Sequence, residues 1–372
     1  MLRQSNSYQE RAKKYANRKY ALALFKIFYL FIFLVLFLNS NASTFLVNFL
    51  KTHLPYFLVL PLYLFLLILI YYIFTWPFNF YESYILEHSF LLSKQSLRDW
   101  FSDELKSGGV IYIIAFILIS VFYLILHKFP RQWWLVVSFF CVFFNIILTK
   151  IFPIIILPLF FKYKKLEDEV LKNRIMSLAK KMSVHLIDCF EIDFSRKTLK
   201  ANAALVGWGK SRRVILADTL KERYTHDEIE VILAHELSHY RLKHIWKLIL
   251  INSFSVFIIF FFIFRTQRIV LNFFGFSSLN ELEALPILFL YFLTYGLIMQ
   301  PGEAFLSRIF ERNADRLAIK VTGLKEAFIS LMNKLADQNL ADRKPHPLVK
   351  FFFFDHPPIE ERIALAKDFP DV

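Results

Sequence analysis

Cysteine is almost absent from this chain. Only two cysteines occur in 372 residues, Cys141 within an apolar stretch and Cys189 at the start of a predicted strand in a polar one. Neither has other metal-binding side chains beside it, so the sequence argues against a disulfide framework and against a cysteine-based metal site. This sparse use of cysteine is consistent with a soluble portion that faces a reducing compartment such as the cytosol.

Glycine and acidic residues are also scarce. The chain has 8 glycines but 45 phenylalanines, and 56% of its residues are hydrophobic, a composition typical of integral membrane proteins. Lys and Arg outnumber Asp and Glu by 45 to 31, which gives a formal net charge of +14. The basic residues flank apolar stretches and no nucleic-acid-binding module is recognisable, so we expect contact with a lipid bilayer and not with nucleic acid.

Long apolar runs, in contrast, are abundant. Six of them are long enough to span a membrane, and Pro301 and Gly302 are expected to end the sixth. The stretch 304–319 could form another, so the sequence predicts six or seven transmembrane helices. The first run follows a basic segment and is interpreted as an uncleaved signal anchor, although Ser40-Asn41-Ala42 could pass for a signal-peptidase site. The six runs of membrane-spanning length lie at about 20–38, 54–78, 110–126, 133–161, 246–264 and 285–299.

These runs divide the chain into four predicted regions. Residues 1–161 form a membrane region with about four transmembrane helices, in which the segment 81–106 is expected to be an amphipathic helix on the membrane surface. Residues 162–245 are a soluble portion, residues 246–303 hold two more transmembrane helices, and residues 304–372 are mostly polar and helical. In the soluble portion the pattern predicts a helix at 166–182 and strands at 189–194, 201–207 and 213–216.

The sequence His235-Glu236-Leu237-Ser238-His239 lies on a predicted helix of the soluble portion. Histidines four residues apart point to the same side of a helix, so both imidazoles can bind one zinc ion while Glu236 acts on a water beside it. Thr225 and Glu228 have the form of a capping box that starts this helix about two turns earlier. The alternative is a chance occurrence of a short motif.

A catalytic zinc usually takes a third protein ligand. Glu311 is the strongest candidate because Asp315 shares its helix face, so that one carboxylate can bind metal while the other accepts a hydrogen bond from a ligand imidazole. The alternative is a solvated helix face with ion pairs, and Glu303 is a weaker candidate ligand. With the basic N-terminus in the cytoplasm, six spans place the catalytic portion and the C-terminus on that same side.

At this point the chain resembles the type I CAAX prenyl proteases, which are integral membrane zinc endopeptidases, and the resemblance covers most of the chain. It implies a mainly α, polytopic membrane protein of six to seven transmembrane helices with a small cytosol-facing α+β, zincin-like catalytic portion. The residues that carry it are His235-Glu236-x-x-His239, Glu311-x-x-x-Asp315, Asn202-Ala203, Arg212–Leu220 and His356-Pro357-Pro358-x-x-Glu361-Arg362.

The resemblance implies roles at the metal. His235, His239 and Glu311 would bind one Zn²⁺ per chain, Glu236 would be general base and then general acid, and Asp315 would orient a ligand histidine.

The resemblance also implies roles toward a peptide or protein substrate, prenylated substrates included. Asn202 and Ala203 would lie on an edge strand that pairs with the substrate backbone. His356 and Arg362 would line the cleft and stabilise the oxyanion or hold the substrate. Without the resemblance, Asn202 fits a turn, His356 a helix cap, and Arg362 an ion pair with Glu361 or another acid.

The leading hypothesis is therefore a membrane-embedded zinc metalloendopeptidase with CAAX-type C-terminal processing. One alternative is a heat-shock-type metalloprotease of membrane-protein quality control, which shares the metal motifs. Another, from a different class, is an inactive membrane scaffold or transporter. The intact Glu236 argues against the second alternative, because a structural metal site needs no general base.

Overall fold

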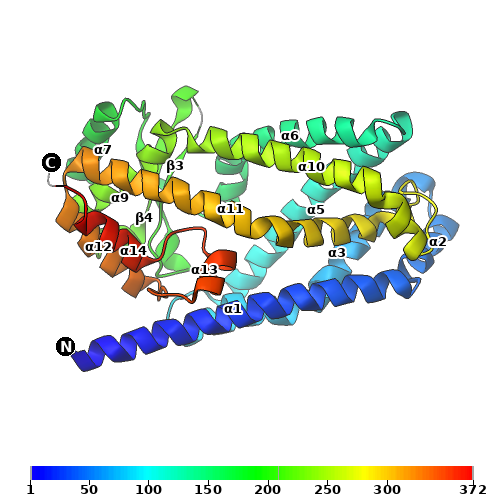
Figure 1. Ribbon diagram of the computed structural model, residues 1–372, viewed down its shortest axis with the longest axis horizontal. Helices are drawn as coiled ribbons and strands as arrows, with labels where there is room; N and C mark the ends of the chain where they lie inside the picture. Colours follow the sequence, from blue (N-terminus) through cyan, green and yellow to red (C-terminus); the bar gives the residue numbers. More distant parts are fainter. Residues whose placement is uncertain (1, 208, 371–372) are drawn as a thin grey trace.

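The computed structural model describes residues 2–207 and 209–370, and long helices run side by side along an elongated molecule (Figure 1). Six helices in these residues are long and apolar enough to cross a membrane, which confirms a mainly α, polytopic fold. The short helix α2 (Ala42–His53) follows the first of them. The six are built on α1 (Leu2–Asn39), α3 (Tyr56–Phe80), α5 (Leu97–Lys128), α6 (Trp133–Ile151), α10 (His244–Phe273) and α11 (Leu285–Thr322).

The helix of the sixth span does not end at Pro301, where the sequence predicted its end. Helix α11 continues through Pro301 and is 38 residues long, so the stretch 304–319 belongs to the same helix and is not a separate seventh one. A proline removes one backbone hydrogen bond, which neighbouring helices and local adjustments can compensate in a membrane protein. The expected boundary between residues 303 and 304 thus falls inside one helix, which also carries Glu311.

The segment 81–106 also differs from the single surface helix that was predicted. Its first part continues α3 as a π-helical turn, η1 (Tyr81–Leu86), and as α4 (Glu87–Ser89), and its last part begins α5. Among its apolar residues, Leu86 and Trp100 are buried within the protein, whereas Leu91 and Leu105 are exposed. Part of the alternation of polar and apolar residues therefore reflects packing between helix ends.

The soluble portion contains a four-stranded sheet in the order β1-β2-β4-β3. Strands β2 and β4 pair in parallel, and both outer pairs are antiparallel. Because β3 has β4 as its one strand partner among the described residues, it is an edge strand. The strands are β1 (Tyr163–Lys165), β2 (Cys189–Ile192), β3 (Ala203–Val206) and β4 (Arg213–Ala217).

Helices from distant parts of the sequence pack beside this sheet (Figure 1). The α-helices of this end are α7 (Glu169–Lys181), α8 (Asp218–Lys221), α9 (His226–Arg241), α12 (Lys325–Gln338), α13 (Pro347–Phe353) and α14 (Ile359–Lys367). Short π and 3₁₀ turns complete the chain: η2 (Phe152–Ile156), η3 (Leu157–Leu159), η4 (Phe194–Arg196), η5 (Gly209–Ser211) and η6 (Leu282–Ala284).

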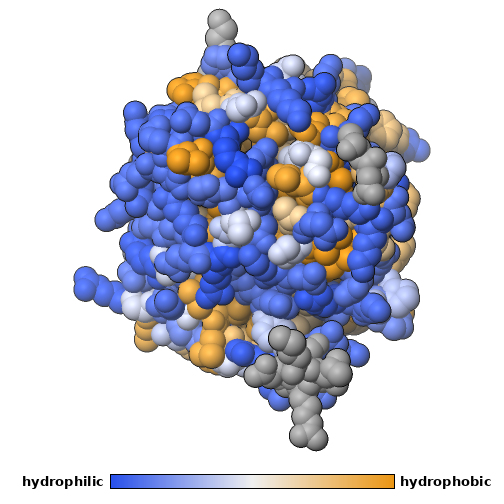
Figure 2. Space-filling view, turned by 90° about the vertical axis from the view of Figure 1, so that its left-hand side faces the viewer, coloured by the Kyte–Doolittle hydropathy of each residue, from blue (hydrophilic) through white to orange (hydrophobic). Residues whose placement is uncertain are grey.

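Two large hydrophobic clusters stabilise the two ends of the molecule. In the soluble portion, Leu237 of α9, Ile319 of α11 and Phe328 of α12 belong to one cluster, which holds the helices of the candidate site together. In the membrane portion, side chains such as Phe28 and Phe139 are more than 60% exposed, as expected for residues that face lipid. The end that carries the soluble portion is instead mainly hydrophilic (Figure 2).

Candidate active site

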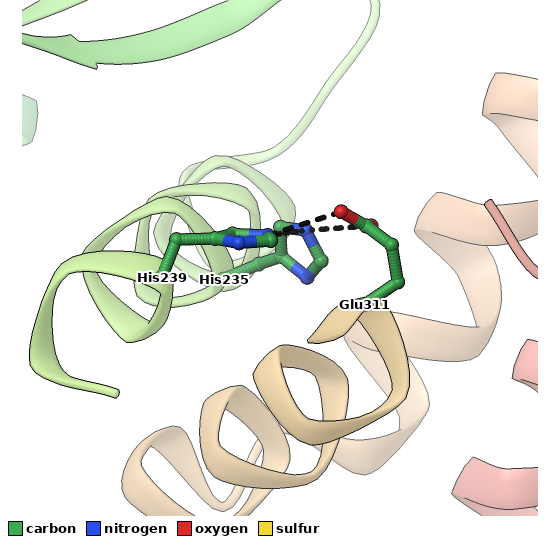
Figure 3. A group of neighbouring side chains, drawn as sticks. All are labelled: His235, His239 and Glu311. Carbon is green, nitrogen blue, oxygen red and sulfur yellow. Dashed lines mark hydrogen bonds and ion pairs between the residues drawn. The ribbon is translucent and has the colours of Figure 1, made fainter. Parts of the chain in front are cut away.

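Helix α9 positions the two histidines of the motif. It begins with the predicted capping box, in which the Thr225 hydroxyl accepts a hydrogen bond from the Glu228 N–H and the Glu228 carboxylate accepts one from the Thr225 N–H. Leu233 and Leu237 on the same helix are fully buried. This anchoring fixes the rotation of α9, so that His235 and His239 point toward α11 (Figure 3).

The third candidate ligand, Glu311, approaches from α11. One carboxylate oxygen lies 3.2 Å from Nε2 of His235 and the other 3.2 Å from Nε2 of His239, and the two imidazole Nε2 atoms are 3.1 Å apart. Ligands of a tetrahedral zinc at about 2.0–2.1 Å from the metal stand about 3.3 Å apart. The residues present therefore fit a bound metal ion, and their three ligand atoms form a metal-compatible group.

The electrostatics of this group also favour a cation. Burial alone would lower the pKa of His235, but the carboxylates of Asp315 and Glu311 outweigh it and raise the pKa to about 10. Two carboxylates thus favour positive charge at a buried imidazole, and a metal ion would supply such charge at the same place. Glu303, the weaker candidate, is exposed and lies outside the metal-compatible group.

Asp315 and Arg362 support the first histidine. Nδ1 of His235 lies 2.8 Å from the Asp315 carboxylate, whose two oxygens also accept hydrogen bonds from Arg362 Nε at 2.8 Å and Nη2 at 2.6 Å. Asp315 is completely buried. This hydrogen bond fixes the orientation of the His235 ring and would leave its Nε2 free to bind a metal ion. Arg362 therefore contacts Asp315 and not Glu361, which instead pairs with Arg312.

Glu236 and His356 also lie at this site. Burial raises the pKa of Glu236, and a raised pKa would suit proton uptake near neutral pH. Nδ1 of His356 lies 2.7 Å from a carboxylate oxygen of Glu311. This contact is the main reason that the pKa of His356 is raised, so His356 is favoured as a proton-bearing donor beside the metal group.

A cavity of about 640 Å³ opens over the site and collects the predicted substrate residues. Asn202, directly before strand β3, and Ala203, the first residue of β3, line it, and Tyr20 of α1 lines another wall. The Asn202 carbonyl accepts a hydrogen bond from the Ala217 N–H, which extends the pairing of β3 with β4. All the predicted site residues therefore line this cavity, except Asp315 and His239, which contact residues that do.

One residue at the site was not found by sequence reasoning. His244, the first residue of α10, is buried, and its Nδ1 lies 3.1 Å from Nδ1 of His239. His244 lies five residues after His239, which matches neither the helical spacing of three or four residues nor the His-Glu-x-x-His motif. A third histidine so close in sequence could nevertheless have indicated a residue of the site.

Comparisons with known proteins agree with this geometry. The model of peptidase family M48 matches residues 165–369, and the model described as CAAX prenyl protease N-terminal, five membrane helices, matches residues 4–162. In this chain, residues 4–162 contain four candidate spans and the shorter helix α2.

Individual relatives cover most of the chain. An uncharacterised metalloprotease, YhfN, of Bacillus subtilis is 30% identical over 91% of this chain and 80% of its own length. CAAX prenyl protease 1 of Saccharomyces cerevisiae is 31% identical over 77% of this chain and 67% of its own length. The crystal structure of Ste24p from S. mikatae superposes with a TM-score of 0.88 at 25% identity, covering 98% of this chain and 89% of that one.

The matched regions contain both the membrane helices and the metal-compatible group of α9 and α11. Sequence, fold and site therefore agree on one assignment: the chain belongs to peptidase family M48 and is a multi-pass membrane metallopeptidase.

Proposed function

We propose that the protein is a zinc endopeptidase that processes the C-terminal region of prenylated CAAX proteins at the cytoplasmic face of a membrane. The observation that carries the chemistry is the convergence of His235, His239 and Glu311 beside a cavity that is also lined by Glu236. Two imidazoles and one carboxylate are a ligand set typical of catalytic zinc in peptidases.

The protein side chains divide the reaction among them. When bound by His235, His239 and Glu311, zinc supplies a Lewis acid that polarises the scissile carbonyl and lowers the pKa of water toward about 7. Glu236 accepts a proton from the attacking water and returns it to the leaving nitrogen as the peptide bond breaks. His356 donates a hydrogen bond to the oxygen that becomes negatively charged on the substrate carbonyl.

The substrate backbone is held beside strand β3. An extended peptide can add to a free sheet edge, which fixes its register through backbone hydrogen bonds without a strong side-chain code. Asn202 and Ala203 are the residues of this edge that line the cavity together with Glu236. Arg362 reaches the cavity wall while it holds Asp315, so its main role here is to position that carboxylate.

The prenylated substrate class is supported by the relatives named CAAX prenyl protease 1 and by the match to the N-terminal CAAX protease model. The cytoplasmic orientation is supported by basic residues at the end of the molecule where both termini lie (Figure 1). Labelling of a cysteine introduced at Asp342 in sealed vesicles of known sidedness tests this orientation.

The deciding experiment is cleavage of a farnesylated CAAX peptide by detergent-purified protein, beside the same peptide without farnesyl and an unmodified membrane protein. Chelator-sensitive cleavage of the farnesylated peptide is the expected result. Cleavage of the membrane protein alone would retain the zinc chemistry and move the role to quality control. If no substrate is cleaved and the protein purifies without zinc, the enzymatic proposal is wrong.

A further inference from the structure

His244 is a buried polar residue at the junction between the site and a membrane helix. It opens α10 and is 1% exposed. Its Nδ1 lies 3.1 Å from Nδ1 of His239, and its Nε2 is buried without a hydrogen-bond partner among the described residues. Its ring stacks on Phe310, at 4.6 Å between centroids and 17° between planes. Phe310 directly precedes Glu311.

The proton positions in this pair follow from the metal site. A neutral imidazole carries one proton, and the nitrogen that binds a metal cannot carry it. Nε2 of His239 faces Glu311 and His235, so a metal bound there leaves the proton on Nδ1. That N–H must then donate to Nδ1 of His244, which requires the proton of His244 to be on its Nε2.

We propose that His244 is a positioning residue that fixes the proton arrangement and the ring orientation of His239 for metal binding. The proposal rests on the zinc site of the proposed function and adds a residue to it. The two ligand histidines are then held by different acceptors: His235 by the carboxylate of Asp315, and His239 by a neutral imidazole.

The surroundings of His244 suit this role better than simple packing. A histidine that only filled space would leave two ring nitrogens without partners in an apolar environment, a cost that an apolar side chain avoids. Here one nitrogen has a partner and the ring lies flat on Phe310, so its acceptor atom is held toward His239. The same contact links α10 to the turn of α11 that carries Glu311.

The test compares zinc affinities of full-length variants in detergent by competition with a chromophoric chelator. His244→Phe keeps a stacked ring but removes the acceptor, and we expect its zinc dissociation constant to rise about 10- to 100-fold. His244→Asn places an amide oxygen near the position of Nδ1, so its affinity should stay within a few-fold of wild type. Phe310→Leu removes the stacking partner but leaves the acceptor, so its loss of zinc affinity should be clearly smaller than that of His244→Phe.

Thermal unfolding of the metal-free variants separates this role from a loss of folding. If His244→Phe does not fold, His244→Leu replaces it as the variant without an acceptor. Wild-type zinc affinity in the folded variant without an acceptor overturns the proposal. So does an equal loss in His244→Asn and Phe310→Leu, because packing would then explain the effect. Failure of the wild-type protein to bind zinc would instead refute the proposed function itself.

Discussion

Asp315→Asn tests how much the metal site depends on a buried ion pair. The Asp315 carboxylate accepts hydrogen bonds from Nδ1 of His235 and from two nitrogens of Arg362. Asparagine has nearly the same shape but one acceptor oxygen and no charge. Its NH₂ group must therefore face a donor, and the guanidinium of Arg362 loses its counter-ion.

The burial of the pair determines the size of the effect. The side chain of Asp315 is 0% exposed and that of Arg362 is 11% exposed, so water cannot replace the lost carboxylate. Removing one partner of a buried pair costs about 3–5 kcal/mol, whereas an exposed pair contributes about 0–1 kcal/mol. Loss of the partner of a metal-binding histidine adds a drop of about 10- to 100-fold in metal affinity.

The matched control is Asp337→Asn. Asp337 also pairs with an arginine, Arg343, at 3.0 Å, but its side chain is 55% exposed. We expect this control to change the unfolding free energy by no more than about 0.5 kcal/mol and to leave zinc affinity unchanged. Tryptophan fluorescence during denaturation in detergent, together with zinc competition, measures both quantities. Equal stabilities and zinc affinities for the two variants would refute the reasoning.

Three further results are expected. Glu236→Gln should retain zinc but lower the cleavage rate by about 10²- to 10⁴-fold, because it removes the general base and spares the ligands; retained hydrolysis would contradict its role. Glu311→Ala should lose zinc, and unchanged zinc content would move the third ligand elsewhere. Burial would raise the pKa of Glu228, but its hydrogen bond with Lys334 contributes to a pKa below the ordinary value. Its stabilising effect is therefore present above about pH 4.3 and is lost as the pH falls further, so Glu228→Gln should reduce the acid sensitivity of unfolding, and an unchanged pH profile would count against this.

Local patterns in the sequence predicted the start of helix α9 and the grouping of the three candidate ligands. The capping box at Thr225 and the spacing of the two histidines depend on residues within one helix, so they can be recognised without tertiary information. Glu311 and Asp315 were predicted to share a helix face, and the carboxylates of both residues contact the imidazole of His235.

Features that depend on tertiary contacts were harder to predict. The end of the sixth long helix was misplaced because hydropathy falls after Pro301, whereas the helix continues to Thr322 and contacts α9. Strand β1 has three residues, too few for an alternating pattern. The contact of His244 with His239 crosses from one helix to the next, so no periodicity within a helix could reveal it.

The unbroken course of α11 fixes the height of the reaction relative to the lipid. Glu311 follows Leu285 by 26 residues, which corresponds to about 39 Å of helix, whereas the hydrocarbon layer is about 30 Å thick. With Leu285 at the far boundary of the hydrocarbon and the helix upright, the catalytic group lies level with the lipid headgroups on the other side. A lipid-anchored peptide could thus reach the active site while its hydrocarbon chain stays in the membrane. A thicker or thinner bilayer would change the distance between the active site and the headgroups.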